Sequence, residues 1–143
     1  MLAGVSDADW SAKAKENADF HAAALGRARE GEARVGRRLI AEFVQAAVAA
    51  GLPQSALTVR PYRGNRRYRT GLTGWYLLPD QSVAVDADAN FYILSCPPSL
   101  TGRLRGIEMP PSPAPLRVGE RDGESMALKD LLAKRLAAGA AHP

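Results

Sequence analysis

The sequence contains one cysteine, Cys96, so it cannot form an intramolecular disulfide. A chain of 143 residues does not need one, because a domain of this size buries about 68 to 70% of the surface that its unfolded chain exposes. We therefore expect one self-supporting domain over residues 1–143, in a thiol-reducing compartment.

Long apolar runs are also missing. No run approaches the roughly 20 residues that a transmembrane helix needs. The first ten residues carry two aspartates and no basic side chain, which is unlike a secretory or organellar targeting peptide. We expect a cytoplasmic protein without a membrane partner.

Side chains for catalysis are scarce. Only His21 and His142 could serve Cys96 as a base, and a lone cysteine at the end of an apolar strand is more typical of a core residue. The segment from Gly71 to Gly74 lacks the lysine and the spacing of a phosphate-binding loop. The sequence predicts no catalytic residue and no cofactor, with a small enzyme of unrecognised site as an alternative.

The segment that starts at Asp86 matches only the first positions of a calcium-binding loop. Asp86, Asp88 and Asn90 match its first three ligand positions. The position that needs glycine is Phe91, and the position that needs a bidentate glutamate is Pro97. Asp and Asn are also the ordinary residues of a turn, so we predict no metal site.

The segment from Ser6 to Ala50 favours a helix, because Ala, Lys, Glu and Arg dominate it and proline is absent. Unbroken, it would be about 65 Å long at 1.5 Å per residue. Gly26, Gly31 and Gly36 each cost about 1 kcal/mol relative to alanine inside a helix. We expect a break or kink between Gly26 and Gly36.

The first part of this helix has a weak apolar stripe. Trp10, Phe20 and Leu25 are spaced among alanines, which leaves three options open: loose packing, pairing with another copy of the chain, or partial disorder. High helix propensity alone also explains the alanines. We predict a helical extension over residues 1–30 and a compact core over residues 36–140.

Two segments carry the wide apolar stripe that is typical of helices on a core. The first is the C-terminal half of the Ser6–Ala50 segment, which Gly51 and Pro53 end. The second lies near the C-terminus, with Ser125 as a candidate cap and Gly139 at its end. Their apolar residues are Leu39, Ile40, Phe43, Val44, Ala47 and Val48 in the first, and Leu128, Leu131, Leu132 and Leu136 in the second.

Short apolar runs separated by turn residues predict an antiparallel meander over residues 74–96. Ala56–Val59 adds a strand before it, and Leu116–Val118 adds a short edge strand after it. We therefore predict a two-layer α+β fold, with an antiparallel sheet of about four or five strands covered by the long N-terminal helix and the C-terminal helix. The meander runs are Trp75–Leu78, Ser82–Val85 and Phe91–Leu94.

Alternation places Tyr92, Leu94 and Cys96 on one face of the last run and Phe91 on the other, so both faces are apolar. The prolines of residues 110–115 cannot join a central ladder and predict an extended crossing over the surface.

Positive charge is concentrated in one loop. Removing its five arginines from the formal net charge of +4 leaves −1, so the rest of the chain is nearly neutral. Concentrated charge creates a local field that attracts anions. The candidate binding residues of this loop are Arg60, Tyr62, Arg63, Arg66, Arg67, Tyr68 and Arg69.

The loop contains a plausible hairpin turn at residues 64–65. Closed there, it would place Arg63 opposite Arg66 and Arg60 opposite Arg69, and like charges across a ladder are destabilising. Either the hairpin does not form in the free protein, or an anion offsets the repulsion.

We therefore predict a non-enzymatic binding or adaptor module that uses this loop against an acidic protein surface. The alternative is a single-stranded nucleic-acid-binding protein, because arginines with interleaved tyrosines also suit phosphate contact and base stacking. A mobile, solvated loop that only keeps the protein in solution would show the same pattern.

Overall fold

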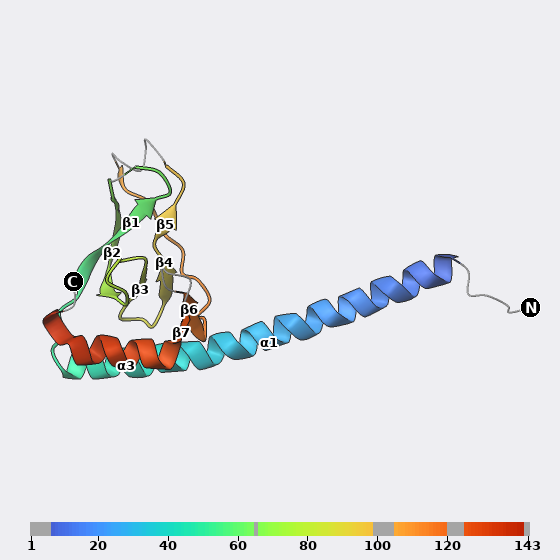
Figure 1. The fold of residues 1–143 in the computed structure, drawn as a ribbon, viewed down its shortest axis with the longest axis horizontal. Coiled ribbons are helices and arrows are strands. Elements are labelled where there is room, and N and C mark those ends of the chain that lie inside the picture. Colours follow the sequence, from blue (N-terminus) through green and yellow to red (C-terminus); the bar gives the residue numbers. More distant parts are fainter. Residues whose placement is uncertain (1–6, 65, 99–104, 120–124, 142–143) are drawn as a thin grey trace, which may run out of the picture. The chain divides into compact units, whose positions relative to one another are not determined.

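The computed structural model describes residues 7–64, 66–98, 105–119 and 125–141 (Figure 1). The chain divides into two compact units, Met1–Glu32 and Ala33–Pro143. The described residues of the first unit are all helical and belong to α1 (Asp7–Ala49), whose later residues belong to the second unit. The second unit contains the strands, the other helices and the hydrophobic core.

Helix α1 is continuous from Asp7 to Ala49, so of the break or kink predicted between Gly26 and Gly36 the break is wrong. The glycines cost about 1 kcal/mol each, but most of the other residues are good helix formers. Gly36 has a packing role, because a Cβ there would lie 2.8 Å from the Cβ of Ala114. Ser6, the predicted first helical residue, lies outside the described residues. No helix of the described part is long and apolar enough to cross a membrane.

The second half of α1 packs on the sheet as its stripe predicts. Ile40, Phe43, Val44 and Ala47 are buried, whereas Val48 is 62% exposed and its prediction is wrong. The ring of Phe43 meets Trp75 edge to face, with centroids 5.9 Å apart. The Trp75 indole N–H donates to the carbonyl of Leu52, just after Gly51 ends the helix in a positive-φ conformation. One tryptophan therefore fixes the helix, the turn after it and the sheet.

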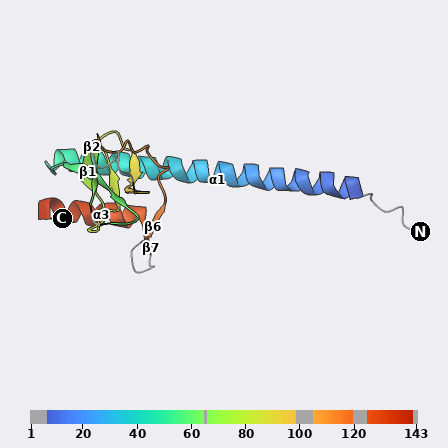
Figure 2. The ribbon, with the colours of Figure 1, turned by 90° about the horizontal axis from the view of Figure 1, so that it is seen from above.

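The main sheet has five strands in the order β4-β3-β2-β1-β5, and the predicted α+β fold is confirmed. All neighbouring strands pair antiparallel except β1 and β5, which are parallel. Figures 1 and 2 show α3 and the second half of α1 on the same side of the strands. The strands are β1 (Ser55–Pro61), β2 (Tyr68–Tyr76), β3 (Val83–Val85), β4 (Phe91–Ile93) and β5 (Ser95–Cys96).

The outermost strands in this order, β4 and β5, belong to one continuous segment of the chain, residues 91–96. Its first half pairs with β3 and its second half pairs with β1. Leu94 joins the halves: its N–H donates to the Ser82 carbonyl at 2.8 Å, and its own carbonyl accepts the Arg60 N–H at 3.0 Å. Both faces of this segment are apolar because each packs into a hydrophobic cluster, Phe91 in one and Tyr92 and Leu94 in the other.

Successive side chains of the strands fill two separate hydrophobic clusters. The cluster on the helix side includes Trp75, Val83, Val85 and Phe91. The other includes Tyr92, Leu94 and Cys96, which confirms that these three share a face, and burial raises the pKa of the Cys96 thiol. The remaining buried members of this second cluster are Leu57, Val59, Tyr68, Tyr76 and Ala84.

The C-terminal part adds a second, two-stranded sheet of β6 (Arg117–Gly119) and β7 (Ser125–Ala127), followed by α3 (Leu128–Ala138) and the short 3-10 helix η1 (Gly139–Ala141). The predicted edge strand therefore pairs with β7, not with the main sheet. Ser125 does not cap α3, because it pairs with Gly119 and Ala127 occupies the N-cap position.

Arg135 is buried at the end of α3, where its Nε donates to the Tyr76 carbonyl at 2.7 Å and its Nη1 to the Gly139 carbonyl at 2.9 Å. It ties the helix to the end of β2 and satisfies a carbonyl of the helix terminus. Burial lowers the pKa of this guanidinium. The other charged residue that is buried in the described part is Asp86.

Asp86 organises the turn between β3 and β4. Its carboxylate accepts hydrogen bonds from the backbone N–H groups of Asp88 and Asn90, the Asn90 amide and the Tyr92 hydroxyl. Burial alone would raise the pKa of Asp86, but these hydrogen bonds hold it below its usual value of 3.8. Burial, followed by the bond to Asp86, raises the pKa of Tyr92 to about 12.

We expect acid to destabilise the protein partly through Asp86. Because its pKa is lower in the folded state, its stabilising contribution is present above about pH 4 and is lost as the pH falls through that lowered value. Asp86→Asn should lower the free energy of unfolding at pH 7 by about 1 to 3 kcal/mol and flatten its decline below pH 4. Urea unfolding of both proteins across this pH range is the measurement, and an equally steep decline in the variant would contradict the assignment.

Candidate functional site

The arginine-rich loop lies between β1 and β2, and its geometry depends on their register. Ser55 pairs with Gly74 and Ala56 with Thr73, which is the register that a turn at residues 64–65 predicts. Beyond this point the pairing shifts, because Leu57 alone faces the three residues Thr70 to Leu72. This extra length is a β-bulge in β2.

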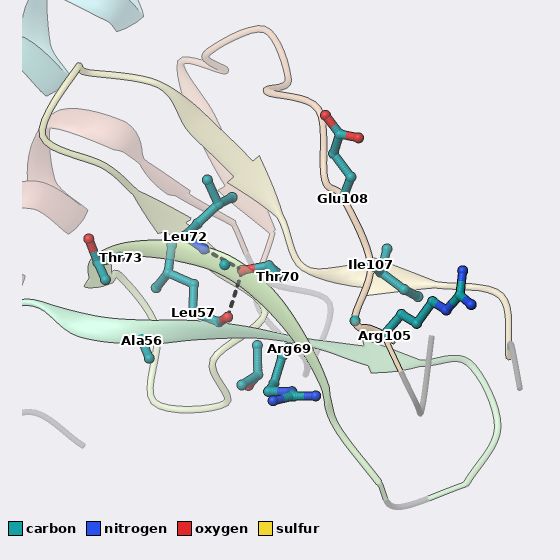
Figure 3. Close-up of a pocket in the computed structure, with 12 residues that line it drawn as sticks. Ala56, Leu57, Arg69, Thr70, Leu72, Thr73, Arg105, Ile107 and Glu108 are labelled. Atoms are coloured by element: carbon teal, nitrogen blue, oxygen red, sulfur yellow. Dashed lines mark hydrogen bonds between the residues drawn. The ribbon is translucent and has the colours of Figure 1, made fainter. Parts of the chain in front are cut away.

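Side chains and one glycine hold the bulge in place. The Thr70 hydroxyl donates to the Leu57 carbonyl at 2.7 Å and accepts the Leu72 N–H at 3.1 Å (Figure 3). Gly71 has a φ of +74°, a conformation that favours glycine. From β1, the Thr58 N–H donates to the Tyr76 hydroxyl at 3.0 Å. Side-chain hydroxyl groups therefore provide partners for three backbone groups at the bulge, the Leu57 carbonyl and the N–H groups of Thr58 and Leu72.

The bulge separates the arginines. Arg69 faces Thr58 and Tyr68 faces Val59, so the predicted opposition of Arg60 and Arg69 is wrong. The ladder between β1 and β2 ends at this Val59 pair, so Arg63 and Arg66 do not face each other across it. The hairpin forms without like charges across its strands and needs no anion to offset repulsion.

The seven predicted binding residues fall into two groups. Tyr68 is only 4% exposed and lies in the second hydrophobic cluster, and Arg67 is half-buried. The others are exposed, and Tyr62 is 71% exposed. We call these exposed residues the arginine surface: Arg60, Tyr62, Arg63, Arg66 and Arg69.

Arg67 has a structural role. Its Nε donates to the Thr58 hydroxyl, and its Nη2 donates to the carbonyls of Thr58 at 2.8 Å and Gln81 at 3.1 Å. These contacts join the arginine loop to β1 and to the turn between β2 and β3. All three acceptors are neutral, so the positive charge of Arg67 is not cancelled.

The burial of Tyr68 could have been predicted from strand alternation. Leu57 and Val59 point inward, and a residue paired across a ladder lies on the same face as its partner. In the regular register of a turn at residues 64–65, Tyr68 would face Pro61, which lies on the same face as Val59, so alternation alone points Tyr68 inward; in the structure it pairs with Val59 itself.

The side chains of Arg60, Arg63 and Arg66 have no hydrogen bond or ion pair with any residue that the structure describes. Asn65, the second residue of the predicted turn, lies outside the described residues. The part of the chain that we can describe thus leaves three guanidinium groups available to a partner.

A pocket of about 670 Å³ adjoins this surface, and Arg69 belongs to both. Figure 3 shows β1, the bulge of β2 and residues 105–108 around it. The Ile107 N–H donates to the Arg69 carbonyl at 2.7 Å, and a Cβ on Gly106 would lie 2.7 Å from that oxygen. The close approach therefore needs glycine, which also has a φ of +83° here.

The pocket lining is suited to anions. Arg69 and Arg105 supply guanidinium groups, and hydroxyl groups come from Thr58, Thr70 and Thr73. Glu108 is the only carboxylate among the described lining residues. Arg105 and Glu108 are not predicted from the sequence, because no local pattern shows that residues 105–108 lie against β2.

Comparisons with known proteins leave the function open, because no family model, no curated protein and no solved structure matches the chain.

Adjacent arginines allow a direct test of the structural role of Arg67. We expect Arg67→Ala to lower the free energy of unfolding by about 2 to 3 kcal/mol, because it leaves the Thr58 and Gln81 carbonyls without their donor. Arg66→Ala removes the same charge from an exposed position and should change stability by less than about 0.5 kcal/mol. Chemical denaturation measures both, and equal losses would show that Arg67 is not the structural residue.

Proposed function

We propose that the protein is a non-enzymatic binding or adaptor module that contacts an anionic partner through the arginine surface. The observation that supports this proposal is the exposure of Arg60, Arg63 and Arg66 without a partner among the described residues. An otherwise nearly neutral chain presents these charges on one loop. Concentrated charge accelerates and orients the approach of an oppositely charged surface.

An acidic protein surface is the partner that these residues fit best. Guanidinium groups bind carboxylates through paired hydrogen bonds, which gives geometric specificity. The neighbouring pocket extends the surface with Arg105 and with threonine hydroxyls. Arg67 is half-buried and contributes to the positive charge of the loop, because its hydrogen-bond acceptors are neutral.

Single-stranded nucleic acid is the second candidate, supported by the exposed ring of Tyr62 beside the arginines. Proteins of this kind stack successive bases on several aromatic rings. Tyr68 is buried, so Tyr62 is the one exposed ring among the described residues of the loop. The described residues of the loop thus combine guanidinium groups that suit phosphate with one exposed ring for stacking, and we rank this function second.

The test compares two polyanions of similar charge, a polyglutamate peptide and oligo-dT, at low salt. We expect the polyglutamate peptide to bind more tightly, and Arg63→Ala with Arg66→Ala to weaken its binding at least about tenfold, a loss of about 1.4 kcal/mol. The affinity should also fall with rising salt. Fluorescence anisotropy measures all of these.

Arg37→Ala with Arg38→Ala is the matched control, since it removes the same charge from exposed positions on α1. An equal loss in the control would mean that net charge, not the loop, drives binding. Tighter binding of oligo-dT would favour the nucleic-acid function, and absence of binding to both polyanions would overturn the proposal.

A further inference from the structure

The described part of the chain exposes two large apolar side chains outside α1. Tyr62, a member of the arginine surface, is 71% exposed, and Ile93 of β4 is 51% exposed. The other large apolar residues that are exposed all belong to α1. A single exposed apolar residue is ordinary on a protein surface. What these two residues indicate therefore depends on where they lie relative to each other and to the arginines.

The pairing of β5 with β1 brings Ile93 close to Arg60. Leu94 and Cys96 point into the second hydrophobic cluster, so Ile93 and Ser95 point to the opposite face. Ser95 pairs with Arg60 in parallel register, and paired residues lie on the same face of a sheet. Ile93 and Arg60 are thus separated by one strand spacing of about 4.8 Å across the sheet and by a rise of about 6.6 Å along it.

Tyr62 continues this face beyond the end of β1. Its N–H donates to the Cys96 carbonyl at 2.9 Å, so the pairing with β5 extends one residue past Pro61. Pro61 is buried, and alternation places Tyr62 on the side of Arg60. A guanidinium group therefore lies between two exposed apolar side chains. We call this set of residues the outer strand face: Tyr62, Arg60, Ser95 and Ile93.

The helices cover only the beginning of the segment that carries Ile93. Phe91, two residues earlier and on the same side of the strand, packs in the hydrophobic cluster that contains the residues of α1 and α3. Figure 1 shows the segment leading from β4 towards β5, beside the end of β1. The apolar side of this segment therefore continues past the helices and becomes exposed next to the arginine surface.

We propose that the outer strand face extends the arginine surface, and that the acidic partner segment carries a large apolar side chain that packs on Ile93 and Tyr62. This inference rests on the proposed function, because it names the kind of acidic segment that the same site binds. Protein interfaces typically combine a few apolar or aromatic anchors with a polar and charged rim. Carboxylates of the segment bind the arginines, and its apolar side chain covers the anchor.

The aliphatic side chain of Ile93 favours a protein segment over a nucleic-acid strand. A strand without sequence preference binds through phosphate contacts and through stacking of its bases on aromatic rings, and Ile93 provides neither. Burial of apolar area against Ile93 instead stabilises the complex with a leucine-like side chain. In an extended peptide, residues two apart lie on one side at a spacing of about 6.6 Å, which suits an apolar residue flanked by acidic residues at alternate positions.

The test uses two acidic peptides of equal charge. Glutamates alternate with serines in both, and the central glutamate is replaced by leucine in one peptide and by serine in the other. We expect the unchanged full chain to bind the leucine peptide at least about fivefold more tightly, because the leucine buries apolar area that serine does not. Fluorescence anisotropy at low salt measures both affinities.

Ile93→Thr removes the apolar contact and keeps a β-branched side chain for the strand. We expect it to reduce the preference for the leucine peptide to about twofold or less. Tyr62→Ser, which lies outside the strands, should also reduce the preference and tests the same face without altering a strand. Val48→Thr is the matched control, because it makes a similar change at an exposed position on α1 and should leave the preference intact. Circular dichroism checks the fold of each variant.

The outcomes separate this inference from the proposed function. Equal binding of the two peptides, weakened by Arg63→Ala with Arg66→Ala, would retain the proposed function and overturn the apolar anchor. A preference that survives both Ile93→Thr and Tyr62→Ser, or that Val48→Thr removes equally, would also overturn it. Tighter binding of oligo-dT than of the leucine peptide, weakened by Ile93→Thr, would assign the face to nucleic acid. Absence of binding to either peptide would overturn both proposals.

Discussion

The bulge in β2 is the constraint on which the arrangement of the arginine surface depends. Without it, the pairing that begins at Ser55 and Gly74 would continue and bring Arg60 opposite Arg69. The two extra residues move Arg69 opposite Thr58, an uncharged residue. The same residues also form part of the pocket wall. One local departure from regular pairing thus relieves repulsion and shapes the adjoining cavity.

The hydrogen-bond partners of the arginines separate those with a structural role from those that we propose for binding. Arg67 and Arg135 donate to carbonyl oxygens, which hold the side chain but leave its charge in place. Arg67 therefore stabilises the loop and still contributes to the positive field beside Arg63 and Arg66. A carboxylate in the same place would have provided the anchor and cancelled the charge.

Sequence patterns predicted the features that depend on neighbouring residues. The meander follows from its turn residues, and both helix stripes follow from their period. The errors arose where a distant contact decides the outcome. The register between β1 and β2 depends on hydroxyl groups from Thr70 and Tyr76. Ser125, the predicted helix cap, instead pairs with Gly119 in a strand. Val48 shows that an apolar stripe can be wider than the surface that covers it.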